Sequence, residues 1–249
     1  MLNYHFLLYA GIQVPVTERP IMPNWTTNDM PDQTGKVVVI TGANSGLGYE
    51  TALALAQKNA QVIIACRNTQ KGEKAAKQIV SAVPNAALNV MPLDLADLES
   101  ISDFAAAFKS QYTQLDQLYN NAGVMAIPRR ETADGFEMQF GVNHLGHFLF
   151  AQMLCPLVEK AQGRIVAVSS IAHRWGLERI KFEDLTFEEG YSSTASYGQS
   201  KLANMLFVHE LQRRLKAAGS AVNAYVVHPG YADTNLQRTG PGGIERWLM

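Results

Sequence analysis

TGANSGLG, residues 41–48, is the stretch that decides the fold. It follows the apolar run KVVVIT (36–41) and opens onto GYETALALAQKN (48–59), which has a helical composition. A chain that leaves a strand, turns sharply beside a phosphate and starts a helix uses glycine at each step, and the helix N-terminus offers amides to the anion. The spacing Gly-x3-Gly-x-Gly differs from the commoner Gly-x-Gly-x2-Gly fingerprint. Its position between strand and helix favours a phosphate-binding loop over ordinary turn and packing glycines.

Short apolar runs alternate with helix-length segments along the rest of the chain. The runs are AQVIIAC (60–66), ALNVMPL (87–93), LDQLYN (115–120), GRIVAVSS (163–170) and AVNAYVVH (221–228). Continuous apolar strands that alternate with helices predict an α/β fold, a doubly wound parallel sheet of Rossmann type. We expect an N-terminal extension over residues 1–34 and a single dinucleotide-binding domain over residues 35–249.

The composition narrows the function and the setting. The 249 residues are 47% hydrophobic with a formal net charge of −1, which argues against a nucleic-acid-binding protein. The two cysteines, Cys66 and Cys155, have no zinc-like spacing, so we predict a reducing, cytoplasmic setting. No run approaches the roughly 18 consecutive apolar residues of a membrane helix, so we expect no transmembrane segment.

Cys66 and Arg67, at the end of the second apolar run, bear on the choice of nucleotide. In folds of this type an acidic residue here binds the ribose hydroxyls of NAD. The sequence has Cys66 instead, and Arg67 offers a planar fork that suits the 2′-phosphate of NADP, with Lys71 and Lys74 nearby. The alternative is a solvated cluster at a helix start. We predict NADP(H) as the preferred cofactor and keep NAD(H) open.

Tyr197 and Lys201 stand one helical turn apart in SYGQSKLANMLF (196–207), so their side chains are neighbours. A tyrosine phenol has a pKa of about 10 and is a poor base at neutral pH. A fixed cation beside it stabilises the phenolate and lowers that pKa. The pair is therefore a candidate proton-transfer device, and the alternative is a chance spacing.

Further motifs follow the glycine loop in a recognisable order. They are LDL (93–95), NNAG (120–123), VSS (168–170), YGQSK (197–201) and HPG (228–230). With these motifs the chain resembles the short-chain dehydrogenases/reductases over residues 34–236, and ACRNTQKGEKA, NHLGHF and SKLANMLF resemble the retinol-dehydrogenase-like branch. The resemblance implies an NADP(H)-dependent carbonyl reductase or alcohol dehydrogenase.

The resemblance also implies a role for individual residues. Tyr197 is the expected general acid/base, Lys201 its activating cation, and Ser170 the hydrogen-bond partner of the substrate oxygen. Asn143 is expected to hold a water that connects Lys201 to solvent. The expected cofactor-binding residues are Gly42, Asn44, Ser45, Gly46, Leu47, Gly48, Arg67, Asp94, Leu95, Asn121, Ala122, Gly123, Tyr197, Lys201, Pro229, Gly230 and Thr234.

Several of these roles have a competing interpretation. Ser169 is the alternative to the serine that follows it, and Asn143 could be an ordinary buried amide bonded to backbone. Asp94 is expected at the adenine, but its carboxylate also suits a helix N-cap. His144 and His147 have no supporting acidic cluster, so we predict no metal site.

Two departures from the family pattern concern the substrate. Tyr197 lies 27 positions after Ser170, a longer gap than in many members, and the inserted loop carries the aromatics Trp175, Phe182, Phe187 and Tyr191. We expect a bulky apolar carbonyl or alcohol as substrate, although the aromatics could instead pack the loop down. The chain ends with TNLQRTGPGGIERWLM, so we expect a shortened domain without the usual seventh strand.

Three functions follow from these patterns. Hydride transfer between NADP(H) and an apolar aldehyde, ketone or alcohol, with Tyr197 as general acid/base, explains the largest number of motifs. A protochlorophyllide-reductase-like enzyme would share NHLGHF and Tyr-x3-Lys, but no obvious cysteine stands near the tyrosine. A non-catalytic NADP(H)-binding protein would suit the shortened C-terminus and not the intact motifs. The expected partner is a small apolar substrate, and a homo-oligomer stays open.

Overall fold

The computed structural model describes residues 25–174 and 179–230, and all structural statements below concern these residues. Two compact units divide the chain between Pro31 and Asp32, and each is described by itself. The described part of the first unit is one 3-10 turn, η1 (Thr27–Asp29), in which Thr26 and Asp29 form a reciprocal capping box. The division of the chain after residue 34 stays a prediction.

The second unit alternates strands and helices in the predicted order. The strands are β1 (Val37–Thr41), β2 (Gln61–Cys66), β3 (Ala87–Pro92), β4 (Gln117–Asn120), β5 (Arg164–Val168) and β6 (Asn223–Val227). The helices are α1 (Gly46–Ala56), α2 (Thr69–Ala82), α3 (Leu98–Gln111), α4 (Met138–Phe140), the π-helix η2 (Gly141–Leu145), α5 (Gly146–Ala161), the 3-10 turns η3 (Ile171–Arg174) and η4 (Phe182–Asp184), and α6 (Ser193–Ala217).

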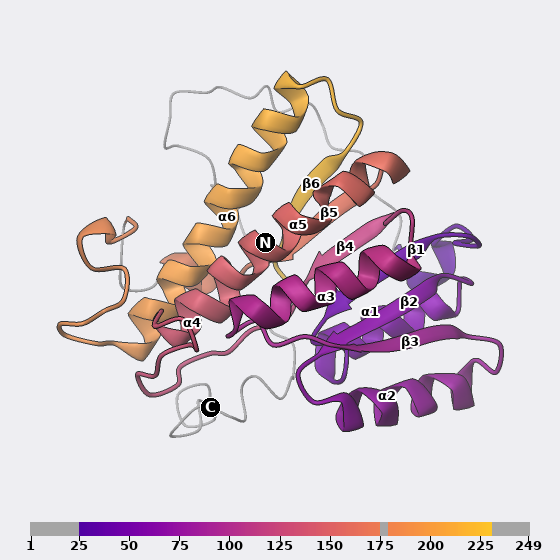
Figure 1. Ribbon diagram of the computed structural model, residues 1–249, viewed down its shortest axis with the longest axis horizontal. Helices are drawn as coiled ribbons and strands as arrows, with labels where there is room; N and C mark the ends of the chain where they lie inside the picture. The colour runs from indigo at the N-terminus through magenta and orange to yellow at the C-terminus, as the bar shows by residue number, and fades with distance from the viewer. Residues whose placement is uncertain (1–24, 175–178, 231–249) are drawn as a thin grey trace, which may run out of the picture. The chain divides into compact units, whose positions relative to one another are not determined.

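The six strands form one parallel sheet in the order β3-β2-β1-β4-β5-β6 (Figure 1). The order confirms the predicted doubly wound fold. The chain first moves outward from β1 to β3 and then returns to β4 beside β1, so the strand order reverses between these two strands. In such sheets ligands bind outside the carboxyl ends of the strands at this switch point.

Alternate strand residues point to opposite faces of the sheet, and helices cover both faces. On one face Val39 and Leu118 belong to a core that includes Phe104 and Phe108 of α3 and Phe150 of α5. The rings of Phe104 and Phe150 meet edge to face, with centroids 5.0 Å apart. Helices α1 and α2 contact β1, β2 and β3. This two-sided burial explains why the strands read as continuous apolar runs rather than as alternating ones.

A π-helical turn, η2, interrupts the segment between α4 and α5. Such turns are rare and occur often at functional sites, and this one carries Asn143. Directly after it, a Cβ atom at Gly146 would lie 2.5 Å from the carbonyl oxygen of Leu95, so the helix passes close to the chain that follows β3.

Strand β6 pairs with β5 and, among the described residues, with no other strand. Tyr225 and Val227 on it are 49% and 41% exposed. The expectation of a missing seventh strand concerns residues 231–249, which lie outside the described residues. The predicted cofactor-binding residue Thr234 is one of them.

Candidate active site

The glycine loop joins β1 to α1 as the sequence predicts. Gly42 and Gly46 have φ angles of 70° and 54°, in the left-handed region that favours glycine. A Cβ atom at Gly48 would lie 2.6 Å from Asn121 Nδ2 and 2.7 Å from the Gly42 carbonyl oxygen. Ser45, the N-cap residue of α1, makes no capping hydrogen bond through its side chain. The first amides of α1 are therefore available to an anion.

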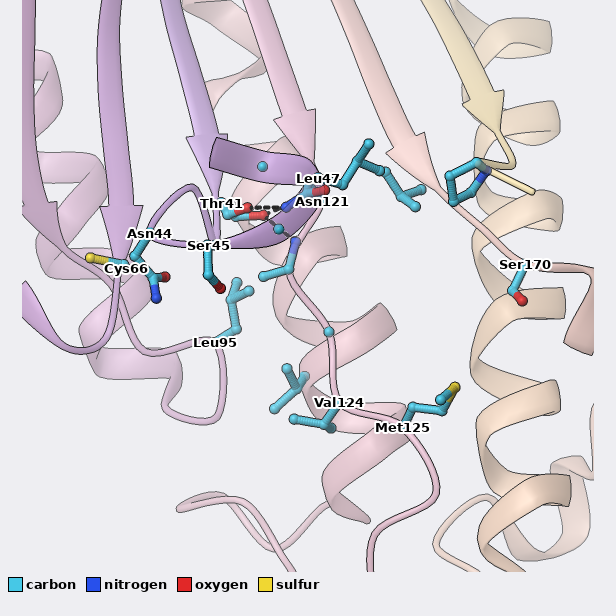
Figure 2. Close-up of a pocket in the computed structure, with 18 of the residues that line it drawn as sticks. Thr41, Asn44, Ser45, Leu47, Cys66, Leu95, Asn121, Val124, Met125 and Ser170 are labelled. Atoms are coloured by element: carbon cyan, nitrogen blue, oxygen red, sulfur yellow. Dashed lines mark hydrogen bonds between the residues drawn. The ribbon is translucent and has the colours of Figure 1, made fainter. Parts of the chain in front are cut away.

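A cavity of about 420 Å³ runs along the carboxyl ends of the strands (Figure 2). Figure 2 shows Asn44, Ser45 and Cys66 on one side of it and Ser170 on the other. Of the predicted site residues, its lining contains Gly42, Asn44, Ser45, Gly46, Leu47, Gly48, Arg67, Asp94, Leu95, Asn121, Ala122, Gly123, Ser170, Tyr197, Lys201, Pro229 and Gly230. Residues predicted from motifs far apart in the chain thus share one cavity.

Asp94 and Leu95 line this cavity, but the alternative role of Asp94 as a helix N-cap is wrong. The N-cap of α3 is Asp97, whose carboxylate accepts hydrogen bonds from the amides of Glu99 and Ser100. The carboxylate of Asp94 accepts a bond from the Ala96 amide in the turn before the helix. Asp97 takes the cap because it is the residue directly before the first helical turn.

Thr41 anchors the NNAG turn to the end of β1. Its hydroxyl oxygen accepts hydrogen bonds from the backbone amides of Asn121 and Ala122, both at 2.9 Å. The Asn121 side chain returns a bond to the Thr41 carbonyl oxygen at 2.8 Å (Figure 2). These contacts fix the turn against the glycine loop, so that Asn121, Ala122 and Gly123 line the cavity together.

Tyr197 and Lys201 lie on the first turns of α6 and face the end of β5. They are 4% and 3% exposed, and Lys201 Nζ lies 5.6 Å from the centre of the Tyr197 ring. Nζ donates a hydrogen bond of 3.0 Å to the carbonyl oxygen of Val168. The Ser169 hydroxyl donates to the backbone carbonyl of Lys201, so its proton is used within the protein. Ser170 is thus the better placed of the two serines for a ligand.

Burial dominates the titration of this pair. It raises the pKa of Tyr197, against a smaller opposite effect of hydrogen bonding with Ser170. The influence that lowers this pKa is the hydrogen bond with Ser170 rather than the Lys201 ammonium, which donates to the Val168 carbonyl. Burial also lowers the pKa of Lys201 itself to about 8. The phenol is therefore protonated at neutral pH and able to donate.

The buried ammonium predicts a stability that rises with pH. Because burial lowers the pKa of Lys201 from 10.5 to about 8, the unfolded chain binds more protons than the folded chain between these values. The destabilisation is complete below about pH 8 and is relieved as the pH rises toward 10.5. Urea denaturation at about pH 7.5 and about pH 9.5 measures this, and Lys201→Met should lack this contribution. Burial raises the pKa of the Cys66 thiol in both proteins, which makes stability fall with rising pH to the same extent in each. The prediction therefore concerns the difference between wild type and Lys201→Met, and an equal pH dependence of the two proteins contradicts it.

Asn143 is fully buried in η2 and is not among the residues that line the cavity. Its Oδ1 accepts from the Val124 amide, while Nδ2 donates to the Val124 carbonyl and to Ser200 Oγ. These bonds agree with the alternative of a buried amide paired with backbone. Its neighbour His144 pairs with Asn204, and within the described ranges no three acidic, histidine or cysteine side chains gather as a metal site.

The inserted loop contributes less to the cavity than its aromatic residues suggest. Phe187 is buried and meets Tyr191 edge to face, and the Tyr191 hydroxyl donates to the Ile127 carbonyl oxygen. These two rings pack the loop down, Phe182 is exposed, and Trp175 lies outside the described residues. Further apolar lining comes from residues that the sequence patterns missed: Val124, Met125, Met138 and Val142. The available signal was that the first two directly follow the NNAG turn.

Comparison with known proteins assigns the family. A family model described as short chain dehydrogenase matches residues 36–182, from β1 to the inserted loop. The chain is a short-chain dehydrogenase. This dehydrogenase is 47% identical to retinol dehydrogenase 11 of Homo sapiens over 245 residues, which are 98% of the chain and 74% of that relative. It is thus an oxidoreductase of the retinol-dehydrogenase-like branch.

Solved structures agree with the fold of this dehydrogenase. A protein from Mycobacterium paratuberculosis is 49% identical, with a TM-score of 0.76 over 85% of this chain and 74% of that one. Two structures at 24% identity share the fold: an enzyme from Burkholderia phymatum in complex with NAD (TM-score 0.68, 86% and 73% covered) and RhlG from Pseudomonas aeruginosa with NADP (TM-score 0.67, 83% and 77% covered). No helix in the described parts of the dehydrogenase is long and apolar enough to cross a membrane.

Proposed function

We propose that this dehydrogenase transfers hydride between NADP(H) and a small apolar aldehyde, ketone or alcohol, with Tyr197 as the general acid/base. The observation that carries the proposal is that Tyr197, Lys201 and Ser170 meet in the cavity that also contains the glycine loop. A phenol, a hydroxyl and an ammonium in one cavity suit proton transfer at a carbonyl oxygen.

The residues present fit a dinucleotide. The uncapped start of α1 can receive a pyrophosphate, and the absent side chain at Gly48 lets the loop approach Asn121 closely. When bound, the nicotinamide supplies or accepts the hydride. Ser170 would donate a hydrogen bond to the carbonyl oxygen, and Tyr197 would donate its proton there during reduction and take one back during oxidation. Lys201, one turn further on, would favour the phenolate that forms.

The apolar residues of the cavity support an apolar substrate. Val124 and Met125 follow the NNAG turn, Met138 starts α4, and Val142 lies in η2. Thioethers and branched aliphatic side chains contact hydrocarbon groups without requiring a hydrogen bond. The retinol dehydrogenases among the relatives agree with this class of substrate by name.

Arg67 carries the proposed preference for NADP(H). It is exposed, lines the cavity and directly precedes the N-cap of α2. Arg67→Ala should raise the dissociation constant for NADPH by about 10- to 100-fold, the loss of a charge-assisted hydrogen bond, and leave that for NADH unchanged. Titration followed by nucleotide fluorescence measures both constants.

Lys74→Ala is the matched control, since Lys74 is an exposed cation on α2 that does not line the cavity. Its affinity for NADPH should equal that of the wild type. Tighter binding of NADH than of NADPH by the wild type would overturn the cofactor assignment. Binding of neither nucleotide would overturn the function.

A further inference from the structure

His147 joins the first strand to the helix that follows Asn143. It is 3% exposed and lies on α5, four residues after Asn143. Its Nε2 lies 2.9 Å from Thr41 Oγ1, a contact between residues 106 positions apart. Its Nδ1 lies 3.1 Å from the carbonyl oxygen of Asn143. Both ring nitrogens therefore have a buried partner.

The partners determine which nitrogen carries the proton. Thr41 Oγ1 already accepts the amides of Asn121 and Ala122, which use its two lone pairs. Its single hydrogen must then be donated, and His147 Nε2 at 2.9 Å is nearer than the Tyr119 carbonyl oxygen at 3.3 Å. Nε2 is thus the acceptor, and Nδ1 carries the hydrogen that the Asn143 carbonyl accepts. Burial lowers the pKa of His147 to about 3, which keeps the ring neutral.

Each end of this hydrogen-bond chain reaches a part of the candidate active site. At one end Thr41 holds the NNAG turn, which lines the cavity. At the other end Asn143 donates from its side chain to Ser200 Oγ at 3.0 Å. Ser200 Oγ in turn donates to the backbone carbonyl of Tyr197 at 2.7 Å. His147 itself does not line the cavity.

We propose that His147 is a positioning residue that orients the Thr41 hydroxyl to receive the two amides of the NNAG turn. In this way it sets the nucleotide-binding turn in register with the helix segment of Asn143. The inference rests on the proposed function, because the NNAG turn is proposed to contact the bound nucleotide. Its effect is therefore expected first in cofactor affinity and then in kcat.

Two substitutions separate the two bonds. In His147→Gln the amide oxygen can take the place of Nε2 and accept from Thr41. In His147→Asn the shorter amide can replace Nδ1 and leaves Thr41 without its acceptor. We expect His147→Asn to raise the dissociation constant for NADPH about tenfold, the effect of one lost hydrogen bond, while His147→Gln stays within about twofold of the wild type. A role limited to core stability would not produce this split.

His144→Asn is the control, because this half-buried histidine lies in η2 directly before α5 and pairs with Asn204. Its NADPH affinity should match the wild type. If the wild type binds NADPH and His147→Asn and His147→Gln bind it with equal affinity, the inference is overturned. A wild type that binds no nucleotide would overturn the proposed function instead.

A measurement on the unsubstituted protein does not depend on the folding of any variant. Nitrogen-15 NMR of the imidazole distinguishes the two neutral tautomers. The inference requires His147 to carry its hydrogen on Nδ1 and to stay neutral at about pH 5. A hydrogen on Nε2 would contradict it.

Discussion

Tyr197→Phe should lower kcat for carbonyl reduction by a factor of about 10² to 10⁴, the usual contribution of a positioned general acid. The substitution keeps the buried ring and its 5.6 Å approach to Lys201 Nζ and removes only the phenol oxygen. The dissociation constant for NADPH should change little, since the other residues of the cavity are retained. Steady-state kinetics with an apolar aldehyde, together with nucleotide titration, measure the two effects.

Tyr119→Phe is the matched control for this substitution. Tyr119 is a half-buried tyrosine on β4 that does not line the cavity, and its hydroxyl donates to the Gln117 side chain. Its loss should leave kcat unchanged. Unaltered turnover in Tyr197→Phe would remove the proposed acid from the mechanism, and a comparable loss in both variants would point to a general effect of removing a tyrosine hydroxyl.

Glu137→Ala should lower the free energy of unfolding by about 2 to 4 kcal/mol, the combined effect of a lost helix cap and of buried donors left without acceptors. Glu137 is 1% exposed. One carboxylate oxygen accepts the Gln139 amide at 3.0 Å, and the other accepts the Phe140 amide at 2.8 Å. The second oxygen also accepts the Ser196 hydroxyl at 2.6 Å.

Through Ser196 this carboxylate connects the start of α4 to the start of α6, directly beside Tyr197. Its loss should therefore loosen two segments of the candidate active site at once. Glu131→Ala, six positions earlier, is the control. The Glu131 side chain is 51% exposed and pairs with Arg129, and such a surface pair contributes about 1 kcal/mol or less. Urea denaturation of both variants decides, and equal losses would contradict the role given to Glu137.

The sequence was sufficient for those parts of the molecule that depend on local pattern. Apolar runs mark the strands of the sheet, and those of β1, β2 and β5 are rich in Val and Ile because strands buried on both faces have little choice of residue. The glycine loop could be placed because its backbone geometry excludes other residues at Gly42 and Gly48. Residues from the short motifs then met in one cavity because the carboxyl ends of parallel strands share one edge.

The parts that escaped prediction depend on partners distant in the chain. Glu137 meets Ser196 across 59 positions, and His147 meets Thr41 across 106, so neither residue differs locally from a surface glutamate or an ordinary core histidine. The N-cap role considered for Asp94 was wrong for another reason, because the cap is Asp97. Both stand before the same helix, and only the residue at which the helix begins decides which one caps it.

Two of the four apolar lining residues lie in a different part of the fold from the proposed proton-transfer pair. Tyr197 and Lys201 belong to one unbroken 25-residue helix, whereas Val124 and Met125 belong to the connection after β4. Connections of this kind accept substitutions more readily than the elements they join. Mutations of Val124 and Met125 can therefore change which substrate is accepted while the proposed proton-transfer residues stay intact.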